Sequence, residues 1–207
     1  MRGGKLVKVC GMTDGDNIRA VEALGVDILG FIFYPRSPRY VRGIPDYLPE
    51  RAHRAGVFVD AGYDAIMHTR DAFGLEYVQL HGSESPELGG RLRAGGLRVV
   101  KAFGIDAQAR ALPLPGCEWE DACDLYLFDT RTDAHGGSGK SFDWRVLERY
   151  GGRMPFLLSG GIGPGMEDEV KMIGHKMFAG IDLNSRFESA PGMKDVAKLD
   201  AFLNALY

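Results

Sequence analysis

Short runs of apolar, β-branched and aromatic residues recur along the whole chain, separated by stretches of mixed composition. Most positions within a run are apolar rather than alternating with polar ones, which is typical of strands buried on both faces of a parallel sheet. The pattern therefore predicts eight strands, at residues 6–10, 28–33, 55–59, 77–80, 98–103, 125–128, 155–159 and 177–183.

Signals for helix starts and ends lie between the predicted strands. In the first interval, Thr13 and Asp16 resemble a capping box, and Gly25 can end the helix that follows. The other clear starts combine a capping side chain or a proline with an apolar face further on. They lie at Ser85-Pro86, Asp143, Gly163-Pro164 and Asp195.

Eight strands that alternate with helices predict an α/β fold, a (β/α)8 TIM barrel. A chain of 207 residues is near the lower size limit of that fold, so we expect one domain over residues 1–207 with short loops. The alternative is an open doubly wound sheet. That fold would place a Gly-rich dinucleotide turn after the first strand, where this chain has Cys10-Gly11-Met12-Thr13 instead.

Glycine is over-represented, with 29 of the 207 residues, about twice the usual share. The chain has no Gly-X-Y period, only 10 prolines and 45% hydrophobic residues, which excludes collagen-like and disordered chains. We therefore expect the glycines at turns and where a ligand approaches the backbone.

Charge and cysteine content narrow the class of protein further. The net charge is −3 without a basic stripe, which disfavours nucleic acid as a partner. Three cysteines without disulfide spacing predict a reducing, cytoplasmic location, and we see neither a signal peptide nor a membrane span. The five histidines form no metal-binding motif, so we expect no metal.

Most of the predicted strands have polar residues at their carboxyl ends. In barrels of parallel strands the active site lies at these carboxyl ends, because the loops after the strands gather there. One such residue alone is more often a turn or cap, but several on one rim predict a site. They include Cys10, Asp60, His81, Asp129, Ser159, Asp182 and Asn184.

Cys10 has a lysine two residues before it, so Lys8 and Cys10 point to the same side of their strand. A lone cysteine in a strand is more often a buried small hydrophobic residue. If that side is the barrel interior, the Lys8 ammonium would lower the pKa of the thiol and favour the thiolate. An interior Lys8 needs a partner of its own, and Asp182 on the eighth strand is the candidate.

Two Gly-rich stretches suggest phosphate binding. Ser159-Gly160-Gly161 and Asn184-Ser185 follow strands seven and eight, whose loops often hold phosphate in such barrels. Residues 134–141 are similar to a Walker-A loop but follow no strand directly and do not run straight into a helix. We expect that stretch to be a lid over the active site, hinged at Gly136, Gly137 and Gly139.

Several longer motifs together resemble the phosphoribosylanthranilate isomerase family. They are KVCGMT (8–13), GFIFYPRSPRYV (30–41), GVFVD (56–60), VQLHG (78–82), VVKAFGI (99–105), FDT…GGSGKSFDW (128–144), LSGGIGP (158–164) and GIDLNSRFESAPGMKD (180–195). The resemblance implies a TIM barrel that performs a cofactor-free Amadori rearrangement of N-(5′-phosphoribosyl)anthranilate in tryptophan biosynthesis. It also implies a phosphorylated small-molecule substrate and a monomer or homodimer.

The resemblance carries roles for individual residues. It implies that Cys10 is the general base, Asp129 the general acid, and Arg39 the contact of the anthranilate carboxylate. The substrate-binding set would be completed by His81, Asp182, Gly160, Gly161, Asn184 and Ser185, the last four on the phosphate side. Where many relatives have Ser-Ser-Gly after strand eight, this chain has Asn184-Ser185-Arg186, which leaves the phosphate contacts there the least defined.

Two other functions remain open from the residues themselves. One is a different sugar-phosphate isomerase or epimerase on the same scaffold, which would have no need of Arg39. The other is a phosphate-binding barrel without catalysis, which would be expected to have lost Cys10 or Asp129.

Overall fold

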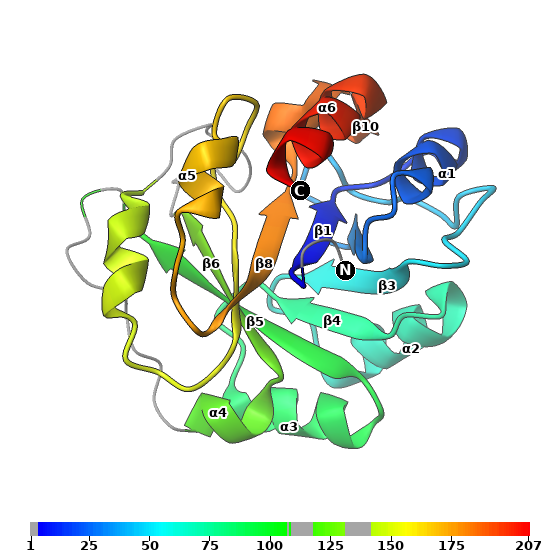
Figure 1. The fold of residues 1–207 in the computed structure, drawn as a ribbon. Coiled ribbons are helices and arrows are strands. Elements are labelled where there is room, and N and C mark those ends of the chain that lie inside the picture. The colour runs from blue at the N-terminus through cyan, green and yellow to red at the C-terminus, as the bar shows by residue number, and fades with distance from the viewer. Residues whose placement is uncertain (1–3, 107, 109–117, 131–141) are drawn as a thin grey trace.

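Eight parallel strands form a closed barrel in the computed structural model, which describes residues 4–106, 108, 118–130 and 142–207 (Figure 1). Each strand pairs with the next, and the eighth pairs with the first. The predicted TIM barrel is therefore confirmed, and every strand agrees with its predicted run to within about two residues. The strands are β1 (Leu6–Cys10), β2 (Ile28–Ile32), β3 (His53–Phe58), β4 (Tyr77–Leu80), β5 (Arg98–Ile105), β6 (Leu125–Thr130), β7 (Phe156–Leu158) and β8 (Phe178–Leu183).

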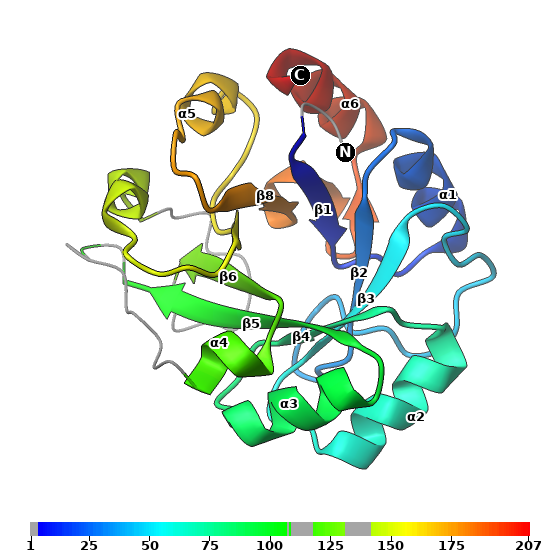
Figure 2. The ribbon, with the colours of Figure 1, turned by 60° about the horizontal axis from the view of Figure 1, so that its bottom comes forward.

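Helices surround the barrel on its outside (Figure 2). Those that the structure describes are α1 (Gly15–Ala23), α2 (Tyr63–Phe73), α3 (Pro86–Ala94), α4 (Glu118–Ala122), α5 (Glu167–Lys171) and α6 (Val196–Leu206), with 3-10 helices η1 (Trp144–Arg149) and η2 (Ser185–Phe187). A short antiparallel pair, β9 (Glu188–Ala190) and β10 (Met193–Lys194), follows η2.

The alternation of strand and helix fails between β2 and β3. Residues 33–52, all of which the structure describes, contain no helix. Four prolines in this segment remove backbone donors and restrict their neighbours, which disfavours a helix. The end of the segment is held instead by the Glu22 carboxylate of α1, which accepts hydrogen bonds from the backbone N–H groups of Glu50, Arg51 and Ala52.

Two of the predicted helix starts are wrong. Asp14, not Thr13, caps α1, because its carboxylate accepts from the N–H of Asn17, whereas the Thr13 hydroxyl donates to the Gly192 carbonyl. The helix expected at Gly163-Pro164 begins only at Glu167, since the backbone of Gly165 is left-handed, with φ +87°. The starts at Ser85, Asp143 and Asp195 are confirmed as capping positions.

The apolar side chains form two layers, one inside the barrel and one between the strands and the helices. Six strands contribute to the inner layer, which includes Ile28, Ala55, Tyr77 and Leu127. Because side chains alternate along a strand, the face that points inward can be followed to the end of each strand. Leu6 packs against the inner layer, so Lys8 and Cys10 of β1 point inward as well.

A β-bulge in β8 changes which of its side chains point inward. The pairing with β7 shifts between Phe156 and Leu157, so that Ala179 joins the inner layer while Ile181 joins the outer one. Asp182 then points into the barrel, at the level of Lys8 in the pairing with β1. The irregular strand therefore brings the two charged residues together.

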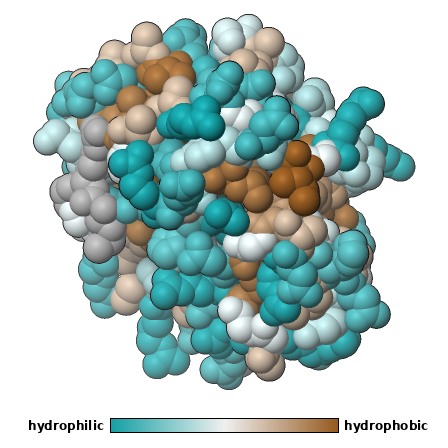
Figure 3. Space-filling model, turned by 90° about the vertical axis from the view of Figure 1, so that its right-hand side faces the viewer, coloured by the Kyte–Doolittle hydropathy of each residue, from teal (hydrophilic) through white to brown (hydrophobic). Residues whose placement is uncertain are grey.

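The surface seen from the side of α1 and α2 is mainly hydrophilic, with separate hydrophobic areas near its centre and at its upper left (Figure 3). Among the exposed large hydrophobic residues are Ile44 and Met172. None of the helices that the structure describes has both the length and the apolar character that crossing a membrane requires.

Closure of the barrel depends on the lack of a side chain at Gly180. A Cβ there would lie 2.0 Å from the backbone oxygen of Leu6, so Gly180→Ala forces β8 away from β1. We expect this substitution to lower the free energy of unfolding by about 3 kcal/mol. Gly90→Ala in α3, whose Cβ would meet nothing within 4 Å, serves as the matched control and should stabilise by about 0.5–1 kcal/mol. Urea denaturation measures both, and equal effects of the two substitutions would contradict this account of the β1–β8 seam.

Candidate active site

Lys8 and Asp182 form a buried ion pair inside the barrel. The ammonium nitrogen of Lys8 lies 3.0 Å from each carboxylate oxygen of Asp182, and both side chains are almost completely buried. The predicted partnership is confirmed. Burial alone would lower the pKa of Lys8, but the carboxylate of Asp182 and the nearby Cys10 outweigh it and raise that pKa. Lys8 is therefore a permanent cation below the rim.

The Cys10 thiol, at the carboxyl end of β1, is 3% exposed. Burial raises its pKa, and although Lys8 and Lys194 both act to lower it, burial outweighs them. The prediction that the Lys8 ammonium holds Cys10 as a thiolate is therefore wrong. Loss of hydration destabilises the charged form by more than the two lysine cations stabilise it. The sulfur has room inside the barrel because β2 has Gly30 beside it, where a Cβ would lie 2.8 Å from Sγ.

Asp129 lies on β6. Along the shorter way round the barrel, β7 and β8 separate this strand from β1, which carries Cys10. The Asp129 side chain is partly exposed, and its Oδ1 accepts from the N–H of Thr130 at 2.8 Å. The backbone of Gly160 approaches it so closely that a Cβ would lie 2.6 Å from Oδ1. Asp129 therefore faces the open end of the barrel, beside the Gly-rich turn.

His81, after β4, lies within ion-pair distance of Asp129. Its Nε2 lies 3.6 Å from Oδ2 of Asp129, and its Nδ1 lies 2.7 Å from the side-chain nitrogen of Gln79. If Gln79 donates to Nδ1, the imidazole proton sits on Nε2 and points toward Asp129. The structure thus places His81 and Asp129 on the same part of the rim.

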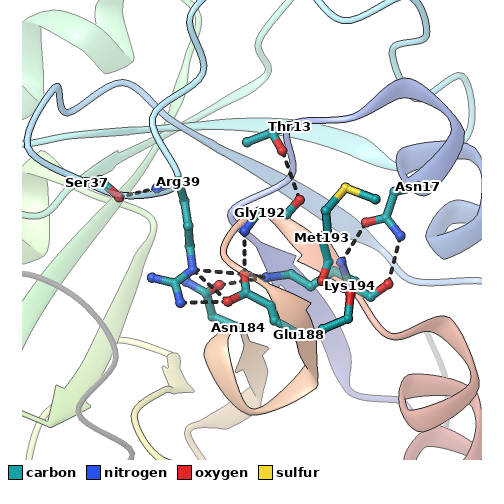
Figure 4. A network of polar contacts seen from close by, with 10 residues as sticks. Thr13, Asn17, Ser37, Arg39, Asn184, Glu188, Gly192, Met193 and Lys194 are labelled. Atoms are coloured by element: carbon teal, nitrogen blue, oxygen red, sulfur yellow. Dashed lines mark hydrogen bonds and ion pairs between the residues drawn. The ribbon is translucent and has the colours of Figure 1, made fainter.

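Arg39 belongs to the segment between β2 and β3. It is held by the carboxylate of Glu188, which lies 149 residues later in the sequence. Nε lies 2.9 and 3.0 Å from the two carboxylate oxygens of Glu188, and Nη2 lies 2.6 Å from one of them (Figure 4). The side chain crosses Gly11, whose φ of +80° and missing Cβ leave space for it. The predicted carboxylate-binding residue is therefore buried and already paired.

The turns after β7 and β8 lie against each other. Gly160 and Gly161 both have left-handed backbones, with φ of +83° and +76°. A Cβ on Gly163 would lie 2.7 Å from Cδ of Arg186, so the arginine stem covers that turn. Ser185 starts η2, and the Asn184 side-chain oxygen accepts from Lys194 Nζ at 2.7 Å. The four residues predicted on the phosphate side thus come together on two adjacent turns.

Some predicted features cannot be placed or were not predicted at all. The lid glycines Gly136, Gly137 and Gly139 lie outside the described residues. Within the described part of the chain, no three acidic, histidine or cysteine side chains are arranged to hold a metal ion. Sequence reasoning missed Glu188 and Lys194, although both lie in the motif at 180–195; their only signal was polar character after the last strand.

Comparison with known proteins gives the family of the chain. A sequence model of the family N-(5′-phosphoribosyl)anthranilate (PRA) isomerase matches residues 7–205. The N-(5′-phosphoribosyl)anthranilate isomerase of Phocaeicola vulgatus is 50% identical over 201 residues, 97% of each chain.

Solved structures agree as well. The phosphoribosyl anthranilate isomerase of Thermotoga maritima, a dimeric enzyme, has a TM-score of 0.79 and 31% identity over 98% of each chain. Another solved isomerase, 29% identical with a TM-score of 0.74 over 98% of each chain, is bound to reduced 1-(o-carboxyphenylamino)-1-deoxyribulose 5-phosphate. The sequence match spans almost the whole barrel, and the chain belongs to the N-(5′-phosphoribosyl)anthranilate isomerase family.

Proposed function

We propose that Cys10 and Asp129 are the general base and the general acid of this isomerase of tryptophan biosynthesis. The reaction converts N-(5′-phosphoribosyl)anthranilate into 1-(2-carboxyphenylamino)-1-deoxyribulose 5-phosphate. One observation carries the assignment: Cys10 is the last residue of β1 and Asp129 the last but one of β6, at the same rim, with β7 and β8 between the two strands. A ribose placed between them presents its ring oxygen to one group and its C2′ hydrogen to the other.

Asp129 supplies the proton for ring opening. As the C1′–O bond of the furanose breaks, its oxygen needs a proton, so Asp129 must carry one when it acts. The nitrogen lone pair of the anthranilate forms the C1′=N bond of a Schiff base at the same time. His81, whose Nε2 is 3.6 Å from Oδ2, is placed to stabilise the carboxylate that remains.

Cys10 removes the C2′ proton that the Schiff base has made acidic. The electron pair moves into a C1′–C2′ double bond, and the resulting enolamine takes up a proton at C1′ and tautomerises to the ketone. A thiolate formed at the buried Cys10 is a stronger base than an ordinary one, because burial raises the pKa of this thiol. Lys8 and Lys194 are the cations that face it.

The anthranilate carboxylate and the phosphate, at the two ends of the substrate, are held on either side of the reacting carbons. Arg39 presents a planar guanidinium fork that matches the anthranilate carboxylate. We assign the phosphate to Gly160, Gly161, Asn184 and Ser185 on the turns after β7 and β8, and Asp182 to the sugar. The solved relative that binds a reduced phosphorylated product supports a ligand of this class.

We extend the proposal to the whole protein. Since each proton transfer has a side chain to carry it, the chain needs no cofactor. It works as a single domain in the cytoplasm, as a monomer or a homodimer, and the dimeric Thermotoga maritima relative supports the second form.

Replacing either catalytic group should abolish turnover but not binding. We expect Cys10→Ser and Asp129→Asn each to lower kcat by about 10²–10⁴-fold, the usual contribution of a positioned acid or base. The measurement follows the fluorescence of freshly made phosphoribosylanthranilate, together with binding of the reduced product. Cys123→Ser and Asp143→Asn, at α4 and η1, are matched controls that should keep wild-type kcat. Full activity of either active-site variant would overturn the assignment.

The pH dependence of kcat/KM should follow the ionisation of the buried Cys10 thiol. The base must be deprotonated to act, and burial raises the pKa of Cys10 above the ordinary 9.0. We therefore expect kcat/KM of the free enzyme to rise with pH, with the midpoint of this limb above 9.0. Alkylation of Cys10 by iodoacetamide, followed by peptide mass, should rise over the same range. A midpoint at or below 9.0 in both measurements contradicts the proposed base.

A further inference from the structure

Glu188 binds one edge of the Arg39 guanidinium and leaves the other edge open. A guanidinium has five N–H groups, one on Nε and two on each terminal nitrogen. The carboxylate of Glu188 accepts from Nε and from Nη2, which is the side edge of the group. Among the described residues, none accepts a hydrogen bond from Nη1. Figure 4 shows the corresponding nitrogen pointing away from Glu188.

The open edge is itself a fork. Nη1 and the second N–H of Nη2 lie in the plane of the guanidinium and are spaced to meet both oxygens of a carboxylate. Arg39 has its own side chain only 8% exposed, and that of Glu188 is 5% exposed, so the pair has little freedom to turn. Glu188 therefore decides in which direction the open fork of Arg39 points.

Lys194 keeps this arrangement positively charged. Arg39 and Glu188 alone would be neutral as a pair and would attract a substrate anion only weakly. The buried ammonium of Lys194 lies 2.6 Å from Oε1 of Glu188 and adds the second cation; burial lowers the pKa of Lys194, and the Glu188 carboxylate acts against that loss. The three groups together carry one net positive charge beside the open fork.

The backbone around Lys194 is fixed to α1. The Asn17 side chain donates to the Lys194 carbonyl and accepts from its N–H, both at 2.8 Å (Figure 4). The Thr13 hydroxyl donates to the carbonyl of Gly192, whose N–H in turn donates to Glu188. The strand pair β9–β10 is thus tied to the helix that follows Cys10.

We infer that Glu188, with Lys194 as its counter-ion, is a positioning residue that aims the open edge of Arg39 at the anthranilate carboxylate. Glu188 does not touch the substrate in this arrangement but acts through Arg39. The inference rests on the proposed role of Arg39 as the carboxylate contact. It predicts that Glu188 determines specificity for the carboxylate and has little influence on the proton transfers.

The test is Glu188→Gln, which keeps the size of the side chain but removes its charge and one of its two acceptor oxygens. We expect KM for phosphoribosylanthranilate to rise about 10–100-fold, since small misplacements of a binding group cost this much, while kcat falls less than about threefold. Binding of two inhibitors gives the sharper readout: the reduced product, and the same compound without its carboxylate. The preference for the carboxylate should fall at least tenfold in the variant.

A merely structural role would give a different result. Glu22→Gln removes the charge of another carboxylate with low exposure, at the amino end of the barrel, where it holds Glu50, Arg51 and Ala52. It should lower the free energy of unfolding and leave KM and the carboxylate preference unchanged. Equal loss of affinity for both inhibitors in Glu188→Gln would overturn the inference. If that variant does not fold, the same ratio measured on Glu188→Asp decides the question.

The variant Arg39→Lys distinguishes a failure of this inference from a failure of the proposed function on which it rests. Lysine lacks the planar fork, so the preference for the carboxylate should collapse and KM should rise more than kcat falls. If the preference survives in Arg39→Lys, the proposed role of Arg39 is wrong. If it collapses there but survives in Glu188→Gln, only the positioning role of Glu188 is wrong.

Discussion

The buried ion pair between Lys8 and Asp182 is the interaction on which the rest of the site depends. It spans the seam at which β1 and β8 close the barrel, with 3.0 Å between the charged atoms. Two charges inside a barrel are stable only when each compensates the other, so neither residue can move or be lost alone. The pair holds the Lys8 ammonium beside Cys10. The β-bulge at Gly180 turns Asp182 inward and so sets the geometry of the pair.

Most of the side chains proposed to act on the substrate are the inward-facing ends of strands rather than parts of long loops. Cys10, His81, Asp129 and Asp182 continue the inner faces of their strands, and glycines make the space around them. Gly11 admits Arg39, Gly30 admits the Cys10 sulfur, and Gly160 lets a backbone turn approach Asp129. The glycine excess of this short barrel therefore has a structural reason at the rim.

Sequence reasoning reached the fold and the strand ends because both depend on local pattern. Runs of buried apolar residues locate all eight strands, and the polar residues that follow them locate the rim. What it missed has separate causes. The pairing of Glu188 with Arg39 joins side chains 149 positions apart, which no local pattern reveals. At the start of α1, Asp14 competed with Thr13 as the cap, and four prolines prevent a helix after β2. The pKa of Cys10 was misjudged because spacing reveals a neighbouring cation but not the extent of burial.

In the proposed function, one rim holds the carboxylate, the sugar and the phosphate of the substrate in fixed places. A crystal structure with the reduced product bound tests this most directly. We expect the carboxylate on the open edge of Arg39 while Glu188 keeps the other edge, the phosphate at Gly160, Gly161 and Ser185, and the ribulose chain between Cys10 and Asp129. A carboxylate bound away from Arg39, or both catalytic groups on one side of the sugar, would contradict the account.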